Sequence, residues 1–131
     1  MAEGPPLVMI VDDDAAIRDA LQFVLQLEGV EVRGHADGPA LLANQDLSRA
    51  GCLILKDCMP AMDGCELLKR VHEQNLSPPA ILLAGAVTPA LRARAEEAGI
   101  WRILEKPILD GRLVDAVSYA LSQYVPPILK H

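Results

Sequence analysis

The sequence predicts an α/β fold in which helices cover both faces of a doubly wound sheet of five parallel strands, in the order 2-1-3-4-5. Five short apolar runs are separated by segments with helical spacing, and this alternation is typical of parallel strands joined by helices. The runs are almost continuously apolar, as in strands that are buried on both faces. They cover residues 7–11, 30–35, 52–56, 80–84 and 101–105.

The first helix is predicted to begin after Asp14, because a carboxylate at an N-cap accepts hydrogen bonds from free backbone amides. Gly29 is expected to close this helix. Apolar residues at three- and four-residue spacing are expected to face the core; they are Ile17, Ala20, Leu21, Val24 and Leu27.

The remaining helices are marked by caps and helix breakers, because an Asp or Thr before a helix and a Gly after it satisfy the free backbone groups at its ends. Proline in the first turn of a helix supports the same assignment. These helices are expected over residues 39–44, after Asp63-Gly64, from Thr88-Pro89 to Gly99, and over residues 109–123.

One domain is expected from the 131 residues, of which 51% are hydrophobic. We assign residues 1–6 to an N-terminal extension, 7–124 to the domain, and 125–131 to a tail or the start of a linker. A net charge of -6 without a basic block argues against direct nucleic-acid or membrane binding. Three cysteines without disulfide or zinc spacing indicate reduced thiols, and we expect a cytoplasmic protein.

Charged residues follow three of the predicted strands. Asp12 and Asp13 follow the first strand, Lys56 and Asp57 stand at the end of the third, and Lys106 follows the fifth. In a doubly wound sheet these ends meet where the strand order reverses, which is where ligands bind. We therefore expect these side chains to share one pocket.

Three motifs stand at these strand ends: Asp12-Asp13-Asp14, the segment Lys56-Asp57-Cys58-Met59-Pro60-Ala61-Met62-Asp63-Gly64, and the pair Lys106-Pro107. Together they resemble the receiver domain of bacterial two-component response regulators, which has a flavodoxin-like fold. In that family an aspartate four residues before the proline of the second motif accepts a phosphoryl group. In this chain that position is Lys56.

The resemblance also assigns roles to the residues around this position. It implies that Asp12, Asp13 and the Cys58 carbonyl are the Mg²⁺ ligands if the site is competent. It further implies that Lys106 contacts the phosphoryl group and that the peptide bond to Pro107 is cis.

Two positions that respond to phosphorylation in the family also differ. A Ser or Thr is usual where this chain has Ala84, and an aromatic residue is usual at Ile103. With Lys56, three functional positions therefore depart from the family pattern together. We expect that a phosphorylation signal, even if it arrived, would not be read in the usual way.

The charges at the site lead to a specific expectation for Lys56. A competent receiver has three carboxylates and one lysine, a sum that one Mg²⁺ neutralises, whereas the equivalent charges here cancel without a metal. An ammonium about 4 Å from a carboxylate gains about 4 kcal/mol at an effective dielectric near 20, before desolvation is subtracted. Lys56 can thus replace the cation. The alternative is a lysine turned to solvent that pairs only loosely with the aspartates, which contributes about 0–1 kcal/mol.

The predicted function is that of an atypical receiver, neither an enzyme nor dependent on a cofactor, that signals through protein contacts. The expected partner is a histidine kinase, a phosphotransfer protein or another signalling protein. The resemblance implies that the chain binds this partner, or a second copy of itself as a homodimer, through the face formed by the fourth helix, fifth strand and fifth helix. Two alternatives stay open: a phosphorylatable receiver that uses Asp57 with Mg²⁺, if the third strand ends one residue later, and a small-molecule-binding module on the same scaffold.

Overall fold

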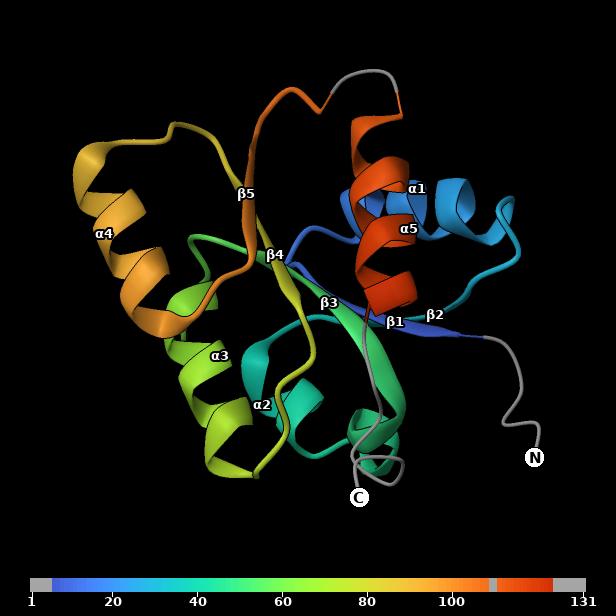
Figure 1. Cartoon of the computed structure of the whole chain (residues 1–131), viewed down its shortest axis with the longest axis horizontal. Helices are drawn as coiled ribbons and strands as arrows, with labels where there is room; N and C mark the ends of the chain where they lie inside the picture. Colours follow the sequence, from blue (N-terminus) through green and yellow to red (C-terminus); the bar gives the residue numbers. More distant parts are fainter. Residues whose placement is uncertain (1–5, 109–110, 124–131) are drawn as a thin grey trace.

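A computed structural model describes residues 6–108 and 111–123 of the chain. Within these residues five parallel strands form one sheet in the predicted order β2-β1-β3-β4-β5. Figure 1 shows β5 and β2 at the two edges of this sheet. The strands are β1 (Leu7–Val11), β2 (Glu31–His35), β3 (Ala50–Lys56), β4 (Ala80–Ala84) and β5 (Arg102–Glu105).

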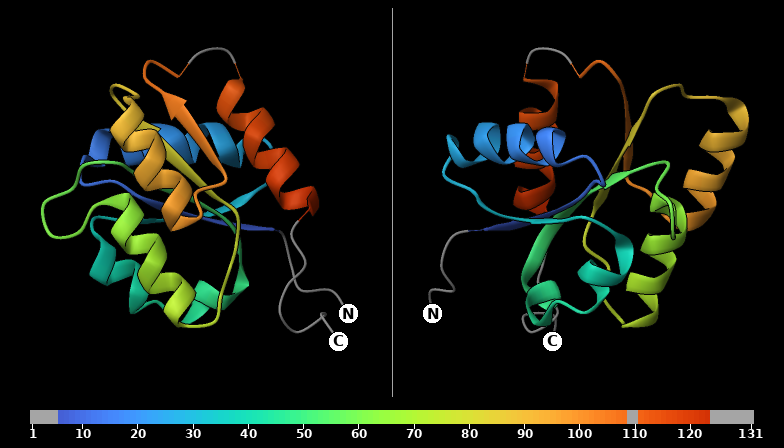
Figure 2. Two further views of the ribbon diagram at one scale, coloured as in Figure 1. Left: turned by 60° about the vertical axis from the view of Figure 1, so that its left-hand side comes forward. Right: turned by 180° about the vertical axis from the view of Figure 1, so that it is seen from behind.

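Helices cover both faces of the sheet (Figures 1 and 2). On one face lie α1 (Ala15–Gln26) and α5 (Arg112–Gln123). On the other face lie α2 (Gly38–Leu42), α3 (Gly64–Glu73) and α4 (Pro89–Ala98). A short 3-10 helix, η1 (Gln45–Arg49), precedes β3 and was not predicted from the sequence. None of the described helices is long and apolar enough to cross a membrane.

The central strands are buried on both faces. In β1 the residues Leu7, Met9 and Val11 pack toward α2, α3 and α4. The alternate residues Val8 and Ile10 pack toward α1 and α5, as the two-residue period of a strand requires. Burying one such side chain contributes about 1.5–3 kcal/mol relative to exposure. The two cores together hold the carboxyl ends of β1 and β3 in the middle of the sheet.

The predicted caps are confirmed. The Asp14 carboxylate accepts a hydrogen bond from a backbone amide of the first turn of α1 at 2.9 Å, and Asp63 does the same for α3 at 2.8 Å. The Thr88 hydroxyl accepts from the first turn of α4 at 3.0 Å. Gly99 ends α4 with a φ of 89°, a left-handed conformation that favours glycine.

The predicted inner face of α1 is wrong in part. Ala20 is exposed, and Val24 and Leu27 are 42% and 69% exposed, whereas Leu25 is the buried residue of this helix. Leu21 is half-buried and packs with Leu25 against the core. Apolar residues occur around most of the circumference of α1, so their spacing alone does not determine which side faces the sheet.

Some predicted segments fall outside the described residues. The expected start of the last helix at residue 109 is one of them, and α5 is described from Arg112. Most of the N-terminal extension and the whole segment 125–131 also lie outside.

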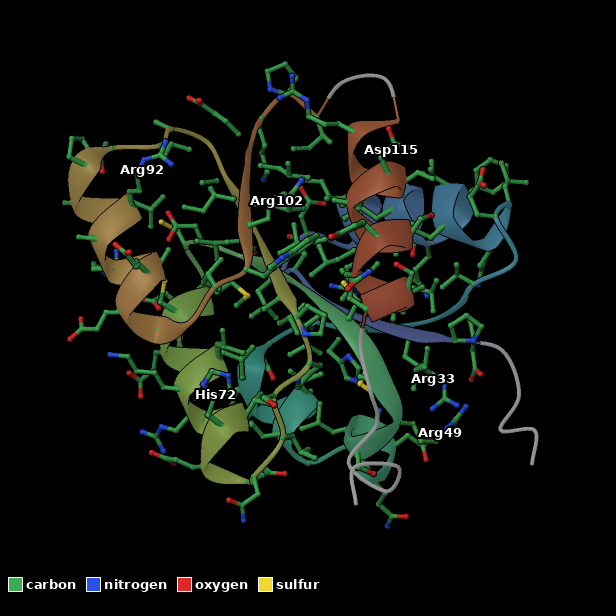
Figure 3. All side chains as sticks on the ribbon, viewed as in Figure 1. Arg33, Arg49, His72, Arg92, Arg102 and Asp115 are labelled. Atoms are coloured by element: carbon green, nitrogen blue, oxygen red, sulfur yellow. The ribbon has the colours of Figure 1, made fainter. Side chains whose placement is uncertain are left out.

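Four charged residues tie η1 to the edge strand β2. Arg33 pairs with Glu31 at 2.7 Å and with Asp46 at 2.8 Å. Arg49 pairs with Glu31 at 3.1 Å and with Asp46 at 3.7 Å, and Figure 3 shows the two arginines beside each other. We call these four residues the β2 charge cluster. An isolated surface pair stabilises a protein little, but a network with shared partners holds its members in place more firmly.

Candidate functional site

Backbone hydrogen bonds hold the segments that follow the strands. The Asp12 amide donates to the carbonyl of the last residue of β2 at 3.1 Å. The Asp57 amide donates to the Leu83 carbonyl at 2.9 Å, and the Lys106 amide donates to the Ala84 carbonyl at 2.8 Å. Each segment therefore continues its strand by one residue before it turns away. The predicted site residues thus lie together beyond the carboxyl ends of the strands.

Lys56, the last residue of β3, reaches the two aspartates that follow β1. Its ammonium Nζ donates to Asp13 Oδ1 at 2.8 Å and lies 3.9 Å from Asp12 Oδ1. The Lys56 side chain is 24% exposed, whereas the Asp12 side chain is 1% exposed. The lysine thus turns inward over the aspartates rather than into solvent.

The ionisation of this pair is favoured on both sides. The hydrogen bond to Asp13 raises the pKa of Lys56, and the charges of Asp12, Asp13 and Asp14 act in the same direction. The hydrogen bond from Lys56 holds the pKa of Asp13 below its usual range, and the charge of Lys106 adds to this effect. Lys56 is therefore an ammonium ion at neutral pH, without the lone pair that a nucleophile needs.

Asp12 is the buried member of the site. Its Oδ1 accepts from the Asp14 amide at 2.9 Å, and its backbone carbonyl accepts from the Arg18 guanidinium at 2.7 Å. Its Oδ2 is buried and has no hydrogen-bond partner in the described part of the chain. A buried carboxylate is costly unless a cation compensates it, and the Lys56 ammonium at 3.9 Å supplies that charge.

Asp57 does not join this group. The pairing of β3 with β4 stays regular to its end, with Lys56 opposite Leu83, so no extra residue turns the Asp57 side chain toward the aspartates. The Asp57 Oδ2 instead lies 3.6 Å from the Cys58 thiol. The charge of Asp57 raises the pKa of that thiol.

The other predicted positions lie around the pocket. The Lys106–Pro107 peptide is cis, as expected. Lys106 is half-buried, and its charge acts on Asp13 without forming an ion pair among the described residues. Ala84 is buried at the end of β4, and Ile103 is half-buried against the core beneath α4.

Two arginines at the site were not predicted. Arg18 of α1 donates to the Asp12 carbonyl, which follows β1. Arg94 of α4 donates to Asp63 Oδ2 at 2.8 Å and so ties α4 to the loop between β3 and α3. The sequence gives only a weak signal for either, because both contacts join residues whose proximity depends on how a helix packs.

Gly64 brings the same loop close to β3. A side-chain carbon at this position would lie 2.6 Å from the Lys56 carbonyl oxygen and 2.6 Å from Leu82 Cδ1. The Gly64 amide donates to the Asp57 carbonyl at 3.1 Å. Glycine is therefore required here by close backbone approach, which fixes where Lys56 and Asp57 lie.

Comparisons with known proteins match most of the chain to one family. The family model of the response regulator receiver domain matches residues 8–118. The C4-dicarboxylate transport transcriptional regulatory protein DctR of Rhodobacter capsulatus is 36% identical over 119 residues, which are 89% of this chain and 60% of DctR. The transcriptional regulatory protein FixJ of Bradyrhizobium diazoefficiens is 35% identical and is matched over 91% of this chain and 58% of FixJ. The chain thus spans less than two thirds of the length of these relatives.

Solved structures of receiver proteins have the same fold as this chain. The crystal structure of FixJ-N has a TM-score of 0.83 and 31% identity, covering 95% of this chain and 98% of FixJ-N. The Vibrio cholerae chemotaxis protein CheY4 has a TM-score of 0.84 and 29% identity, covering 90% of this chain and 100% of CheY4.

Proposed function

This chain belongs to the response regulator receiver domain family, and we propose that it is an atypical receiver that signals through protein contacts without a phosphorylated aspartate. The observation that supports this proposal most directly is the Lys56 ammonium, 2.8 Å from Asp13 and 3.9 Å from Asp12. It stands four residues before Pro60, where the family resemblance implies the phosphoacceptor. We propose no catalytic residue and regard the chain as a signalling module.

The chemistry of Lys56 supports the loss of phosphoryl transfer. A phosphoacceptor attacks with an oxygen lone pair, whereas Lys56 is protonated and its pKa is raised by the hydrogen bond to Asp13. Asp12 and Asp13 remain, but both follow β1 and face the ammonium. The charges at the site cancel, as they do in a receiver that holds Mg²⁺, because the Lys56 ammonium takes the place of the metal ion. The phosphoacceptor carboxylate is missing.

The residues present do not fit Mg²⁺ as they are arranged. Mg²⁺ takes six oxygen ligands in a near-ideal octahedron. Here Asp13 Oδ1 accepts a hydrogen bond from the Lys56 ammonium, and Asp12 Oδ1 accepts one from a backbone amide. A metal ion would have to displace a cation that is covalently attached to β3. We therefore propose that no cofactor is used and that the Cys58 carbonyl is not a metal ligand.

The two switch positions support a fixed conformation. Ala84 has no hydroxyl group that a phosphoryl oxygen could attract, and Ile103 is an aliphatic residue packed against the core. We propose that the output of this receiver is constitutive and that its control passes to the abundance of its partner.

We propose that α4, β5 and α5 form the surface for that output. Two grooves flank β5, with volumes of about 610 and 430 Å³, and Arg102 lines both. Arg92 of α4 lines one of them, and Arg112 and Asp115 of α5 line the other; Figure 3 shows Arg92, Arg102 and Asp115 spread across this side. The mixture of charges suits either a signalling protein, such as a histidine kinase or a phosphotransfer protein, or a second copy of the chain.

The homodimer has its own test. Sedimentation of the purified chain over a range of concentrations measures self-association, and Arg102→Glu is expected to weaken it. If the wild-type chain stays monomeric at all concentrations, the surface serves a different protein.

The three described cysteines carry free thiols, which supports a reducing compartment, and we propose that the protein acts in the cytoplasm.

Neither alternative function is favoured by a specific contact. For Asp57, the described contact is with the Cys58 thiol rather than with the aspartates. For a small-molecule module, the two grooves described above lie beside β5 and not at the carboxyl ends of the strands, where ligands bind in this fold.

The decisive experiment is incubation with acetyl phosphate and Mg²⁺, followed by intact-mass measurement. We expect no phosphoryl adduct on the wild-type chain. The Lys56→Asp variant serves as the positive control, since it restores three carboxylates and is expected to bind Mg²⁺. A wild-type adduct that disappears in Asp57→Asn would overturn the proposal and establish Asp57 as the acceptor.

A further inference from the structure

The larger of the two grooves beside β5 lies between this strand and α5. Its volume of about 610 Å³ is within the range of pockets that hold small molecules. Two buried apolar residues, Leu104 and Ala116, line it together with four exposed polar ones, which are Arg102 of β5 and Arg112, Asp115 and Tyr119 of α5. The groove therefore has an apolar floor between charged and aromatic walls. It lies beside β5 rather than beyond the carboxyl ends of the strands, so it is separate from the Lys56 site.

The two arginines of this groove supply positive charge that the described residues do not neutralise. Five other arginines donate to an oxygen atom of the protein; they are Arg18, Arg33, Arg49, Arg70 and Arg94. Arg102 and Arg112 form no hydrogen bond or ion pair among the described residues. A guanidinium group binds phosphate through two parallel N–H donors. The groove is thus suited to an anion, in a chain whose net charge is -6.

Tyr119 provides a flat surface at the end of the groove that is farthest along α5. Its ring stacks on the indole of Trp101, with the centroids 5.9 Å apart and the planes at 10°. The Arg102 guanidinium lies over the same indole, 4.3 Å from its centroid. Stacking uses the face of the guanidinium, so its N–H groups, which point outward in its plane, can still donate to a phosphate. Tyr119 is 54% exposed, which leaves ring surface for a planar ligand to stack on.

Asp115 indicates what kind of planar ligand the groove prefers. On a helix it neighbours Arg112 at a spacing of three and Tyr119 at a spacing of four. A carboxylate close to a bound phosphate is unfavourable unless the ligand also supplies hydrogen-bond donors. Guanine presents two adjacent donors, N1–H and the N2 amino group, which match the two oxygens of a carboxylate. Adenine presents a donor next to an acceptor on the same edge and does not match.

We propose that the groove between β5 and α5 binds a guanine nucleotide. The base stacks on Tyr119 and donates to Asp115, and the phosphate group accepts from Arg102 and Arg112. The planar ring, the paired donors and the anion of such a ligand each meet a complementary group in one groove. Figures 1 and 2 show the strand and the helix that carry these groups next to each other.

This inference does not depend on the chemistry at Lys56. The groove belongs to the surface proposed above for partner contacts, but nucleotide binding is measured on the chain without any partner. Phosphorylation, self-association and nucleotide binding are thus observed in separate experiments. Loss of one leaves the others interpretable.

The test uses the full chain with GMP, AMP, guanosine and inorganic phosphate as separate probes. Binding is measured by titration calorimetry and mapped by amide chemical shifts. We expect GMP to shift amides of β5 and α5 and to bind at least about tenfold more tightly than each other probe. AMP lacks the paired donors, guanosine lacks the anion, and inorganic phosphate lacks the base. Titrations at an ionic strength of about 0.15 M, where charges beyond about 8 Å are screened, keep the effect of a substitution local.

Substitutions in the groove separate the three contacts. Arg112→Gln is expected to weaken GMP binding at least about tenfold without affecting guanosine. Asp115→Asn is expected to abolish the preference for GMP over AMP. Tyr119→Leu is expected to weaken both nucleotides, whereas Tyr119→Phe, which keeps the ring, should preserve their affinity. All three side chains are exposed, so these variants are expected to fold.

Arg92→Gln is the matched control for the loss of charge. Arg92 is an exposed arginine of α4 that lines the other groove and forms no ion pair among the described residues, so this variant should bind GMP as the wild type does. An effect as large as that of Arg112→Gln would overturn the proposal. So would absence of GMP binding, equal affinity for GMP and either AMP or inorganic phosphate, or shifts that map outside β5 and α5.

Discussion

We expect the contact between Lys56 and the buried Asp12 to make a measurable contribution to stability. We predict that Lys56→Met, which keeps an unbranched side chain but removes the charge, lowers the free energy of unfolding. The Asp12 carboxylate is 1% exposed, so water cannot replace the lost ammonium. The expected loss is therefore larger than for an ordinary surface lysine.

The magnitude follows from the 3.9 Å between Lys56 Nζ and Asp12 Oδ1. At an effective dielectric near 20, two unit charges at that distance attract each other by about 4 kcal/mol. The lysine keeps 24% of its side chain exposed and gives up hydration when it turns inward, and both effects reduce the gain. We expect a net loss of about 2 kcal/mol, which lowers the Tm of a domain of this size by about 6–10 °C.

Urea unfolding followed by Trp101 fluorescence measures this loss. Lys69→Met is the matched control, because Lys69 is an exposed lysine of α3 that forms no ion pair among the described residues. A double-mutant cycle with Asp12→Asn isolates the pairwise energy, and Lys56→Met should cost much less in that background. If Lys56→Met and Lys69→Met differ by less than about 0.5 kcal/mol, the lysine does not compensate the buried carboxylate and our reasoning is wrong.

The pH dependence of the same difference is a second check. The lowered pKa of Asp13 means that its contribution is present above about pH 4 and is lost as the pH falls through its folded-state pKa. The raised pKa of Lys56 means that its contribution is present below about pH 10.5 and is lost as the pH rises through its folded-state pKa. The difference between wild type and Lys56→Met should therefore be constant from about pH 5 to pH 9 and shrink outside that window.

Three further predictions concern residues around the site. Asp57→Asn should accelerate alkylation of the exposed Cys58 by iodoacetamide, because the Asp57 charge raises the pKa of that thiol; an unchanged rate would place the carboxylate elsewhere. His35→Gln should reduce the loss of stability between about pH 7 and pH 5 in urea titrations, since burial lowers the pKa of His35 and only the unfolded chain takes up the proton readily. Gly64→Ala should cost about 1–3 kcal/mol in thermal unfolding through its clash with β3, whereas Gly85→Ala, which has open space around it, should stay within about 0.5 kcal/mol.

The sheet was predictable because buried parallel strands leave a strong signal in sequence. The five apolar runs and their order are confirmed, and the errors lie at strand ends. Strand β3 begins two residues earlier than predicted, at Ala50, whereas β2 and β5 each begin one residue later, at Glu31 and Arg102. The 3-10 helix η1 was missed because only Leu47 within it is buried, so no apolar period marks it. Local geometry of this kind depends on the neighbours that a segment packs against.

The residues of the site were easier to predict than their contacts. Strand ends converge in this fold, so the proximity of Asp12, Asp13 and Lys56 follows from topology. The direction of the lysine does not follow, because its flexible stem reaches either solvent or the pocket. The outer side of α1 was assigned to the core for a related reason: Leu21 and Leu27 both fit an apolar period, and only the packed structure distinguishes them.

The β2 charge cluster has a consequence for behaviour at high concentration. An edge strand presents unpaired backbone groups to which a strand of another molecule can add, and this is one route to fibrils and precipitates. Arg33 and Arg49 with their acidic partners place four charges at this edge, and an incoming strand would have to strip them of water. We therefore expect the colloidal solubility of the chain to depend in part on residues far from the Lys56 site.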